Sequence, residues 1–178
     1  MTTYLAFLRA INLGPTRMFP KDDIRRVVEE TGFEDVATHI NTGNVRFTSA
    51  MRSRARIEGR LEAAFQADRG FDVPTIVFTA REFADLAAEA VALSSPEYVR
   101  HYVYLLKDEP SATVRDAVEA TSSERGDMIV RGRAVHALLR PGYQDGVVDP
   151  LGAAKLLGTA TNRNLNVVKT LADKWCAA

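Results

Sequence analysis

The amino-acid sequence predicts an α+β fold built from two similar halves. Apolar runs typical of strands and apolar stripes typical of helices follow one another in the order β-α-β-β-α-β over residues 1–80, and a similar order returns over residues 99–178. An Ala-rich stretch that ends at Ser94-Ser95-Pro96 separates the two, so residues 81–98 are expected to form a helical connector. The β-α-β-β-α-β order is the split βαβ pattern of ferredoxin-like folds, in which an antiparallel sheet carries its helices on one face.

The first half begins with a strand and a helix. Residues 4–11 form an apolar run interrupted only by Arg9, which is typical of a buried central strand. A helix is expected from Pro20, a favoured first-turn residue, to Gly32, which suits the position after a helix end. Its apolar stripe has the i, i+3, i+4 spacing and consists of Ile24, Val27 and Val28.

A hairpin, a second helix and a further strand complete the first half. The strands expected at 36–40 and 44–48 are joined by Asn41-Thr42-Gly43, whose Asn and Gly tolerate positive φ. A helix is expected at 53–68 and a strand at 74–79.

The second half repeats the architecture without repeating the residues. After a connector helix at 80–91, the expected elements are a strand at 101–106, a helix at 111–121, hairpin strands at 127–130 and 134–139, a helix at 149–157, and a last amphipathic helix at 164–175.

Composition excludes several classes of protein. The chain has 178 residues, 46% of them hydrophobic and 26% charged, which is ordinary for a globular protein and argues against disorder or a coiled coil. The 23 basic side chains balance the 23 acidic ones, so any nucleic-acid binding needs a local basic patch. Cys176 is the only cysteine, and no apolar stretch approaches the ~20 residues of a membrane helix. A soluble cytoplasmic protein without membrane contact is the expectation.

Three stretches together resemble the DUF1697 family of bacterial proteins. The family patterns are LRGINVGG, an SGNVVF hairpin, and T-x-RNWNT before the last helix. They correspond here to residues 8–15 (LRAINLGP), 42–47 (TGNVRF) and 161–167 (TNRNLNV). The resemblance covers essentially the whole chain and implies ferredoxin-like halves, but no activity. Among the departures from the family pattern, Ala10 and Pro15 replace Gly, Leu165 replaces Trp, and Val167 replaces Thr.

The last motif is the first candidate site. Between Asp149 and Asp173 there is no acidic residue, and Asn162, Asn164 and Asn166 stand at the expected start of the final helix. The free N–H groups and partial positive charge of a helix start favour an anion. The basic residues of this stretch are Lys155, Arg163 and Lys169. The alternative is that an asparagine only caps the helix and that Arg163 is solvated or ion-paired.

The first loop and the hairpin give the second candidate site. Residues 1–21 contain no acid, while Arg9 and Arg17 are basic, and Asn12 and Gly14 offer an amide and a bare backbone. The alternative is a structural loop in which Arg9 reaches water. Asn44 is added only on geometric grounds, because strand 1 neighbours strand 3 in a split βαβ fold. The favoured alternative is an Asx-type turn, which explains the hairpin residues without any function.

Other patterns favour structural interpretations. The arginine run that includes Arg52, Arg54, Arg56 and Arg60 has Glu58 and Glu62 as helical neighbours and is typical of a solvated face. The three histidines lie in strands without metal-ligand spacing, and no nucleotide-binding, nucleophile-elbow or zinc motif occurs. No metal or cofactor is therefore expected. Asp145 and Asp149 flank a Gly-containing loop that is either a turn or an acid–base pair.

The resulting hypothesis is a protein that binds an anionic ligand, such as a phosphate- or carboxylate-bearing metabolite, a nucleotide or an RNA segment. Its candidate residues are Arg9, Asn12, Gly14, Arg17, Asn44, Arg163, Asn164, Asn166 and Lys169. Two alternatives stay open at this point: an enzyme acting on a small molecule, and a protein-interaction or dimerisation module. The fold does not choose among them.

Overall fold

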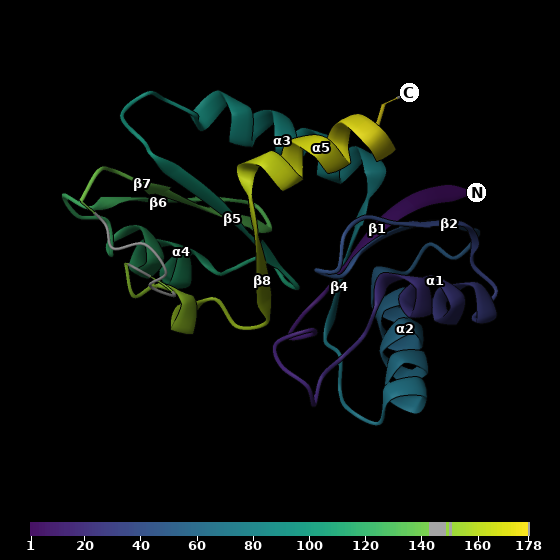
Figure 1. Cartoon of the computed structure of the whole chain (residues 1–178). Coiled ribbons are helices and arrows are strands. Elements are labelled where there is room, and N and C mark those ends of the chain that lie inside the picture. The colour runs from purple at the N-terminus through teal and green to yellow at the C-terminus, as the bar shows by residue number, and fades with distance from the viewer. Residues whose placement is uncertain (143–148, 150, 178) are drawn as a thin grey trace. The chain divides into compact units, whose positions relative to one another are not determined.

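The chain is described here by a computed structural model, which covers residues 1–142, 149 and 151–177. It divides into two compact units, Met1–Phe83 with Lys174–Ala178, and Ala84–Asp173. Each unit is built on a four-stranded antiparallel sheet (Figure 1). The prediction of an α+β fold with two ferredoxin-like halves is confirmed.

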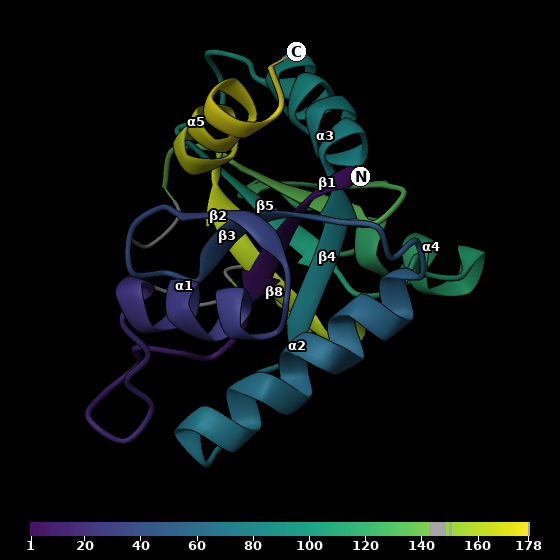
Figure 2. The same cartoon turned by 90° about the vertical axis from the view of Figure 1, so that its right-hand side faces the viewer.

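The first unit has the strand order β2-β3-β1-β4. Its elements are β1 (Thr2–Leu8), α1 (Lys21–Glu30), β2 (Glu34–Thr38), β3 (Asn44–Ser49), α2 (Arg54–Arg69) and β4 (Thr75–Thr79). Both helices cover the same face of the sheet (Figure 2), and their apolar stripes bury alternate residues of β1 and β3. β1 pairs with β3 in the register Phe7 to Asn44, so the expected neighbourhood of strands 1 and 3 is correct.

The second unit has the corresponding order β6-β7-β5-β8. Its elements are α3 (Ala80–Leu93, which begins in the first unit), β5 (Arg100–Leu106), α4 (Ala112–Glu119), β6 (Gly126–Arg131), β7 (Ala134–Leu139), the 3-10 turn η1 (Ala154–Leu156), β8 (Ala160–Asn164) and α5 (Leu165–Trp175, which ends in the first unit). α4 and η1 share a buried cluster with alternate residues of β5, β6 and β7.

Two expectations for the second half were wrong. No α-helix forms over the described part of residues 149–157, where only the short η1 occurs. Asp149 folds back so that its Oδ1 accepts the Ala153 N–H at 2.9 Å, and Gly152 and Gly158 have φ of 74° and 66°, which breaks a helix on both sides. The strand β8 was missed because its side chains are polar and do not show the alternation typical of a half-buried strand.

Both sheets have an edge strand covered by a helical side chain. In the first unit, Glu58 of α2 is 2% exposed, and its Oε2 accepts the Val77 N–H of edge strand β4 at 3.0 Å. In the second unit, Glu119 of α4 accepts the Val130 N–H of edge strand β6 at 3.1 Å. Backbone N–H groups at a sheet edge are thus paired without a further strand.

Candidate functional site

The residues predicted for the site are divided between the two units. Arg9, Asn12, Gly14, Arg17 and Asn44 belong to the first unit, whereas Arg163, Asn164, Asn166 and Lys169 belong to the second.

Asn12 joins the first loop to the hairpin turn. Its Nδ2 donates to the carbonyl oxygens of Phe19 at 3.1 Å and Asn41 at 2.7 Å, and its Oδ1 accepts the Phe19 N–H at 2.7 Å. Asn41 also connects the hairpin turn to the start of α1, because its Oδ1 accepts the Lys21 N–H at 3.0 Å. The Asn12 side-chain amide, which the sequence analysis assigned to a ligand, therefore has protein partners at both its nitrogen and its oxygen.

Arg17 and Asn44 also hold loops in place. Arg17 donates to the carbonyl oxygens of Ala10 at 2.5 Å and Asp72 at 2.6 Å, and its guanidinium lies 4.5 Å from the Phe71 ring centre. Asn44 is buried, and its Nδ2 donates to the His39 carbonyl at 3.0 Å and to Thr42 Oγ1 at 2.8 Å.

Arg9 and Gly14 are the exposed members of the first group. Arg9 follows the last residue of β1, and its backbone N–H donates to the Pro74 carbonyl at 2.9 Å. Gly14 has a φ of 127°, a conformation that glycine adopts easily. Within the first unit, most of the family-like motif therefore has a structural explanation.

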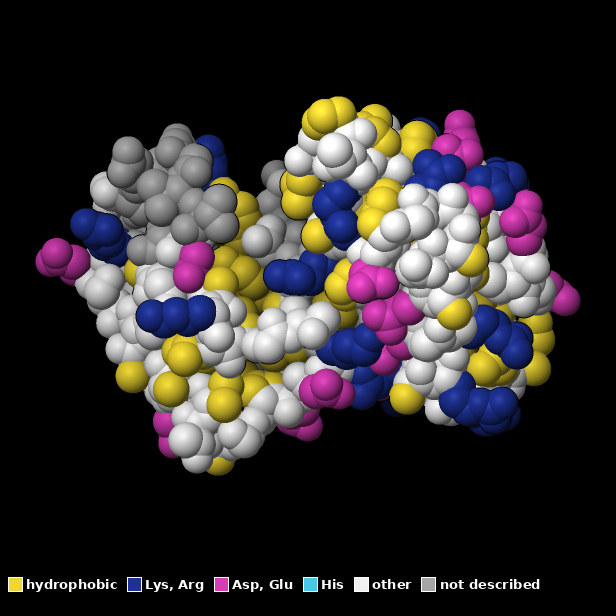
Figure 3. All heavy atoms as spheres, turned by 90° about the horizontal axis from the view of Figure 1, so that it is seen from below, with side chains coloured by type: hydrophobic (Ala, Val, Ile, Leu, Met, Phe, Trp, Pro, Cys, Tyr) yellow, Lys and Arg dark blue, Asp and Glu magenta, His cyan; other side chains and the backbone are white. Residues whose placement is uncertain are grey.

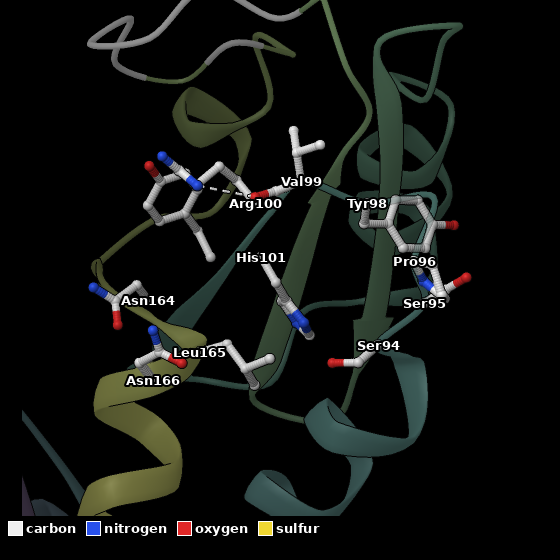
Figure 4. A pocket seen from close by; sticks show the side chains of 11 residues that line it. Ser94, Ser95, Pro96, Tyr98, Val99, Arg100, His101, Asn164, Leu165 and Asn166 are labelled. Carbon is white, nitrogen blue, oxygen red and sulfur yellow. Dashed lines mark hydrogen bonds between the residues drawn. The ribbon is translucent and has the colours of Figure 1, made fainter.

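A pocket of about 690 Å³ lies in the second unit (Figure 4). It is formed by the segment after α3, the start of β5 and the first turn of α5. The pairing of β8 with β5, in which Tyr102 faces Asn164, holds the start of α5 beside the start of β5. Its lining residues with polar side chains are Ser94, Ser95, Tyr98, Arg100, His101, Tyr102, Asn164 and Asn166.

The lining contains a cation and no carboxylate. Arg100 is exposed, and its Nη1 donates to the Val99 carbonyl at 3.1 Å. Among the described residues, the lining includes no Asp or Glu. Asn164 Oδ1 caps α5 by accepting the Val167 N–H at 2.8 Å, which leaves the N–H groups of Leu165 and Asn166 without an acceptor inside the helix. Both the capping interpretation and the pocket position therefore hold for Asn164.

Arg163 and Lys169 lie outside this lining. Arg163 is 7% exposed, and its Nη1 donates to Thr161 Oγ1 at 2.9 Å and to the Asn162 carbonyl at 2.8 Å. Burial lowers the pKa of its guanidinium to about 10. Lys169 is exposed on α5.

One wall of the pocket is held by a polar cluster. The Tyr98 hydroxyl donates to Asp127 Oδ2 at 2.6 Å, and Arg140 Nη2 donates to the same oxygen at 2.6 Å. The hydrogen bond to Asp127, with burial, raises the pKa of Tyr98 to about 12. Because Val99 N–H also donates to the Leu139 carbonyl at 2.7 Å, the segment between α3 and β5 is fixed to the sheet.

The floor of the pocket contains a histidine that sequence reasoning passed over. His101 lines the pocket from β5, and its Nε2 lies 2.9 Å from Nδ1 of His136 on β7. Sequence reasoning set the two residues aside because they are 35 positions apart and lack metal-ligand spacing. The antiparallel register of β5 and β7, which pairs His101 with Leu138, brings them onto one face.

Other candidate chemistry is weak among the described residues. No group of three or more His, Cys, Asp or Glu side chains in the described part of the chain is arranged to hold a metal ion. Burial raises the pKa of the Cys176 thiol to about 11, which disfavours the nucleophilic thiolate. Asp149 is used in the turn before η1, and Asp145 lies outside the described residues.

One face of the molecule can be followed in Figure 3, and it shows no continuous basic patch over the described residues. On the face drawn in Figure 3, acidic and uncharged side chains interrupt the basic ones over the described residues. At the start of α2, Arg54 Nη1 lies 3.4 Å from Oε2 of its i+4 neighbour Glu58, but Glu58 is buried against β4, so this pair is not part of a solvated face. Among the described helices, none combines the length and apolar character needed to cross a bilayer.

Comparison with known proteins shows the family of the chain. The family model described as "Protein of unknown function (DUF1697)" matches residues 1–136, so the chain belongs to this family. Among solved structures, a conserved bacterial protein from Streptococcus pneumoniae is similar with a TM-score of 0.74 and 18% sequence identity, over 99% of each chain. At this identity the likeness shows the fold alone. No curated protein matches the chain.

Proposed function

We propose that the protein binds a small anionic ligand, one carrying a carboxylate or phosphate group, in the pocket of the second unit. The observation that carries the proposal is the lining, which among the described residues contains Arg100, several hydroxyl and amide side chains, and no Asp or Glu. Of the residues expected from the sequence, Asn164 and Asn166 belong to this lining.

The start of α5 adds directed donors. The helix has 11 residues, and its first N–H groups, together with the helix dipole, favour a negative charge. Among the described residues, the Asn166 side-chain amide has no hydrogen-bonding partner, so it is available to a ligand. A volume of about 690 Å³ suits a small metabolite or a mononucleotide.

A second, independent feature points to a ligand in the same place. His101 is 8% exposed, lines the pocket, and has an Nδ1 atom without a hydrogen-bonding partner among the described residues. Buried polar atoms without partners are rare in folded proteins and call for an explanation. A cytoplasmic location, expected because Cys176 stands alone, is part of the same proposal.

Calorimetric titration at low ionic strength tests the proposal, with inorganic phosphate, citrate and AMP as probes. We expect at least one probe to bind, and Arg100→Ala to weaken its binding about tenfold, because a hydrogen bond to a charged group contributes about 1.5–3 kcal/mol. Asn166→Ala should weaken it less.

Two surface variants serve as matched controls. Arg115→Ala removes an exposed cation from α4, and Lys169→Ala removes one from α5 outside the pocket lining. Both should leave affinity unchanged. If all three probes fail to bind, or if Lys169→Ala weakens binding while Arg100→Ala does not, the pocket is not the anion site.

A further inference from the structure

Two buried imidazoles of the second unit share one hydrogen bond. His101 Nε2 and His136 Nδ1 are 2.9 Å apart, and the ring planes are inclined by 67°. His101 is 8% exposed and His136 is fully buried. The two outer nitrogens, His101 Nδ1 and His136 Nε2, have no partner among the described residues.

Both rings are neutral near pH 7. Burial lowers the pKa of His101 to about 4. Burial, with the nearby His101 and Arg131, lowers that of His136 to about 3. A neutral imidazole carries a proton on one nitrogen only, so a single proton lies between the two rings.

Only two arrangements satisfy this shared bond. In the first, His101 Nε2–H donates to His136, which leaves His101 Nδ1 as a bare acceptor and puts an N–H on the outer nitrogen of His136. In the second, His136 Nδ1–H donates to His101, which leaves the outer nitrogen of His136 bare and puts an N–H on His101 Nδ1.

The second arrangement costs less. An N–H group without an acceptor is among the rarest defects in folded proteins, whereas an unused acceptor is tolerated more often. The first arrangement would put such an N–H on His136, which is fully buried, and the second puts it on the residue that lines the pocket. When His136 carries its proton on Nδ1, His101 therefore carries its proton on Nδ1 and offers an N–H donor to the pocket.

We propose that His101 is a binding residue of the pocket, that it presents its Nδ1–H to an unprotonated oxygen of the ligand, and that His136 is the positioning residue that holds this tautomer. The inference rests on the proposed function and narrows it. The ligand carries an acceptor oxygen deep in the pocket, as a carboxylate or phosphate does, in addition to its contacts at the start of α5.

Access to this nitrogen requires a small adjustment. His101 Nδ1 has almost no exposed surface in the structure. Figure 4 shows the ring in the pocket between Leu165 and Ser94. Both are pocket-lining residues, and rotation of such side chains takes place without a change in the backbone. Binding at Nδ1 is therefore coupled to a rotamer change beside the ring.

Nitrogen NMR of ¹⁵N-histidine-labelled protein tests the tautomer directly, because a protonated and a bare ring nitrogen have widely different chemical shifts. The chain has three histidines, and His39 in the first unit is an internal control. We expect His101 and His136 both to carry their proton on Nδ1. Finding both protons on Nε2 would overturn the inference while leaving the anion-binding proposal untouched.

Titration with inorganic phosphate then separates the two proposals. We expect the His101 Nδ1 resonance to shift together with the backbone amides of Ser94 and Asn166, and His39 to stay unchanged. If the amides shift and the His101 ring does not, phosphate binds without His101, and the inference fails alone. If neither moves and calorimetry detects no probe, the proposed function fails as well.

Substitution of His136 tests its positioning role. His136→Asn retains an N–H donor close to the position of Nδ1, whereas His136→Leu removes it. We expect the Asn variant to keep the His101 tautomer and the phosphate affinity, and the Leu variant to lose Nδ1 protonation at His101 and to weaken phosphate binding about tenfold. If His136→Leu fails to fold, the ring-nitrogen shifts of the wild type still decide: a proton on Nε2 of both His101 and His136 contradicts the assignment.

Discussion

Acid should destabilise the protein through the two buried imidazoles. An unfolded histidine titrates near ~6.5. In the fold, the pKa values of His101 and His136 are about 4 and about 3, chiefly because burial disfavours the charged ring. A lowered pKa in the folded state means that the full stability is present above the unfolded pKa and is lost as the pH falls toward the folded values.

The expected magnitude follows from proton linkage. Between the unfolded and the folded pKa values, the unfolded chain binds a proton at each imidazole that the folded chain does not. Each such proton lowers the free energy of unfolding by about 1.4 kcal/mol per pH unit, so the pair contributes about 2.7 kcal/mol per unit in the interval below about pH 6. This is large against the ~5–15 kcal/mol by which domains are stable.

Urea unfolding followed by circular dichroism, from about pH 7 down to about pH 5, measures this slope. The double variant His101→Leu/His136→Leu should show a slope that is shallower by up to the pair's contribution, because neither side chain titrates. His39→Gln is the matched control: it removes one imidazole from the other unit and should change the slope by at most half as much. Equal slopes for the wild type and the double variant would refute the assignment of two neutral buried rings.

Three further predictions concern the first unit, each measured as the free energy of urea unfolding. Gly43→Ala should destabilise by about 2–4 kcal/mol, because Gly43 has a φ of 82° and a Cβ there would lie 2.8 Å from Leu8 Cβ; a loss below about 1 kcal/mol would contradict the close approach. Ala10→Gly should stabilise by up to about 1 kcal/mol, since Ala10 has a φ of 60° where the family pattern has glycine, and the same change at Ala6, inside β1, should destabilise. Glu58→Ala should cost about 2 kcal/mol or more by removing the acceptor at Val77 N–H, and an unchanged midpoint would show that this bond does not support the edge strand.

The order of the elements was predictable where local patterns and tertiary packing agree. The stripe of α1 and the turn Asn41-Thr42-Gly43 place β1 beside β3, because the split βαβ order permits few alternatives. The pattern misled at 149–157, where a helical spacing of apolar residues is overridden by glycines in the left-handed region. The local sequence pattern did not predict β8, because the place of this strand in the sheet depends on its pairing with β5 rather than on its own residues.

The candidate site was predictable only in part, for a related reason. Asn164 and Asn166 stand next to a helix start, which is a local feature that a sequence displays. Pairing of β5 with β8, two segments some 60 residues apart, brings Arg100 and His101 beside the start of α5. A local sequence pattern does not predict contacts at this separation. Asn12 and Arg17 have the residue types of a binding site, but their polar groups are used by carbonyl oxygens of nearby loops.

The carboxylates along the edge strands have a consequence for how molecules of this protein meet one another. Glu58 and Glu119 accept the N–H groups to which a strand of another molecule would otherwise attach. Removal of these side chains would leave these N–H groups of edge strands β4 and β6 open to intermolecular strand addition. A Glu58→Ala/Glu119→Ala variant is therefore expected to form aggregates rich in β-structure at protein concentrations where the wild type stays in solution.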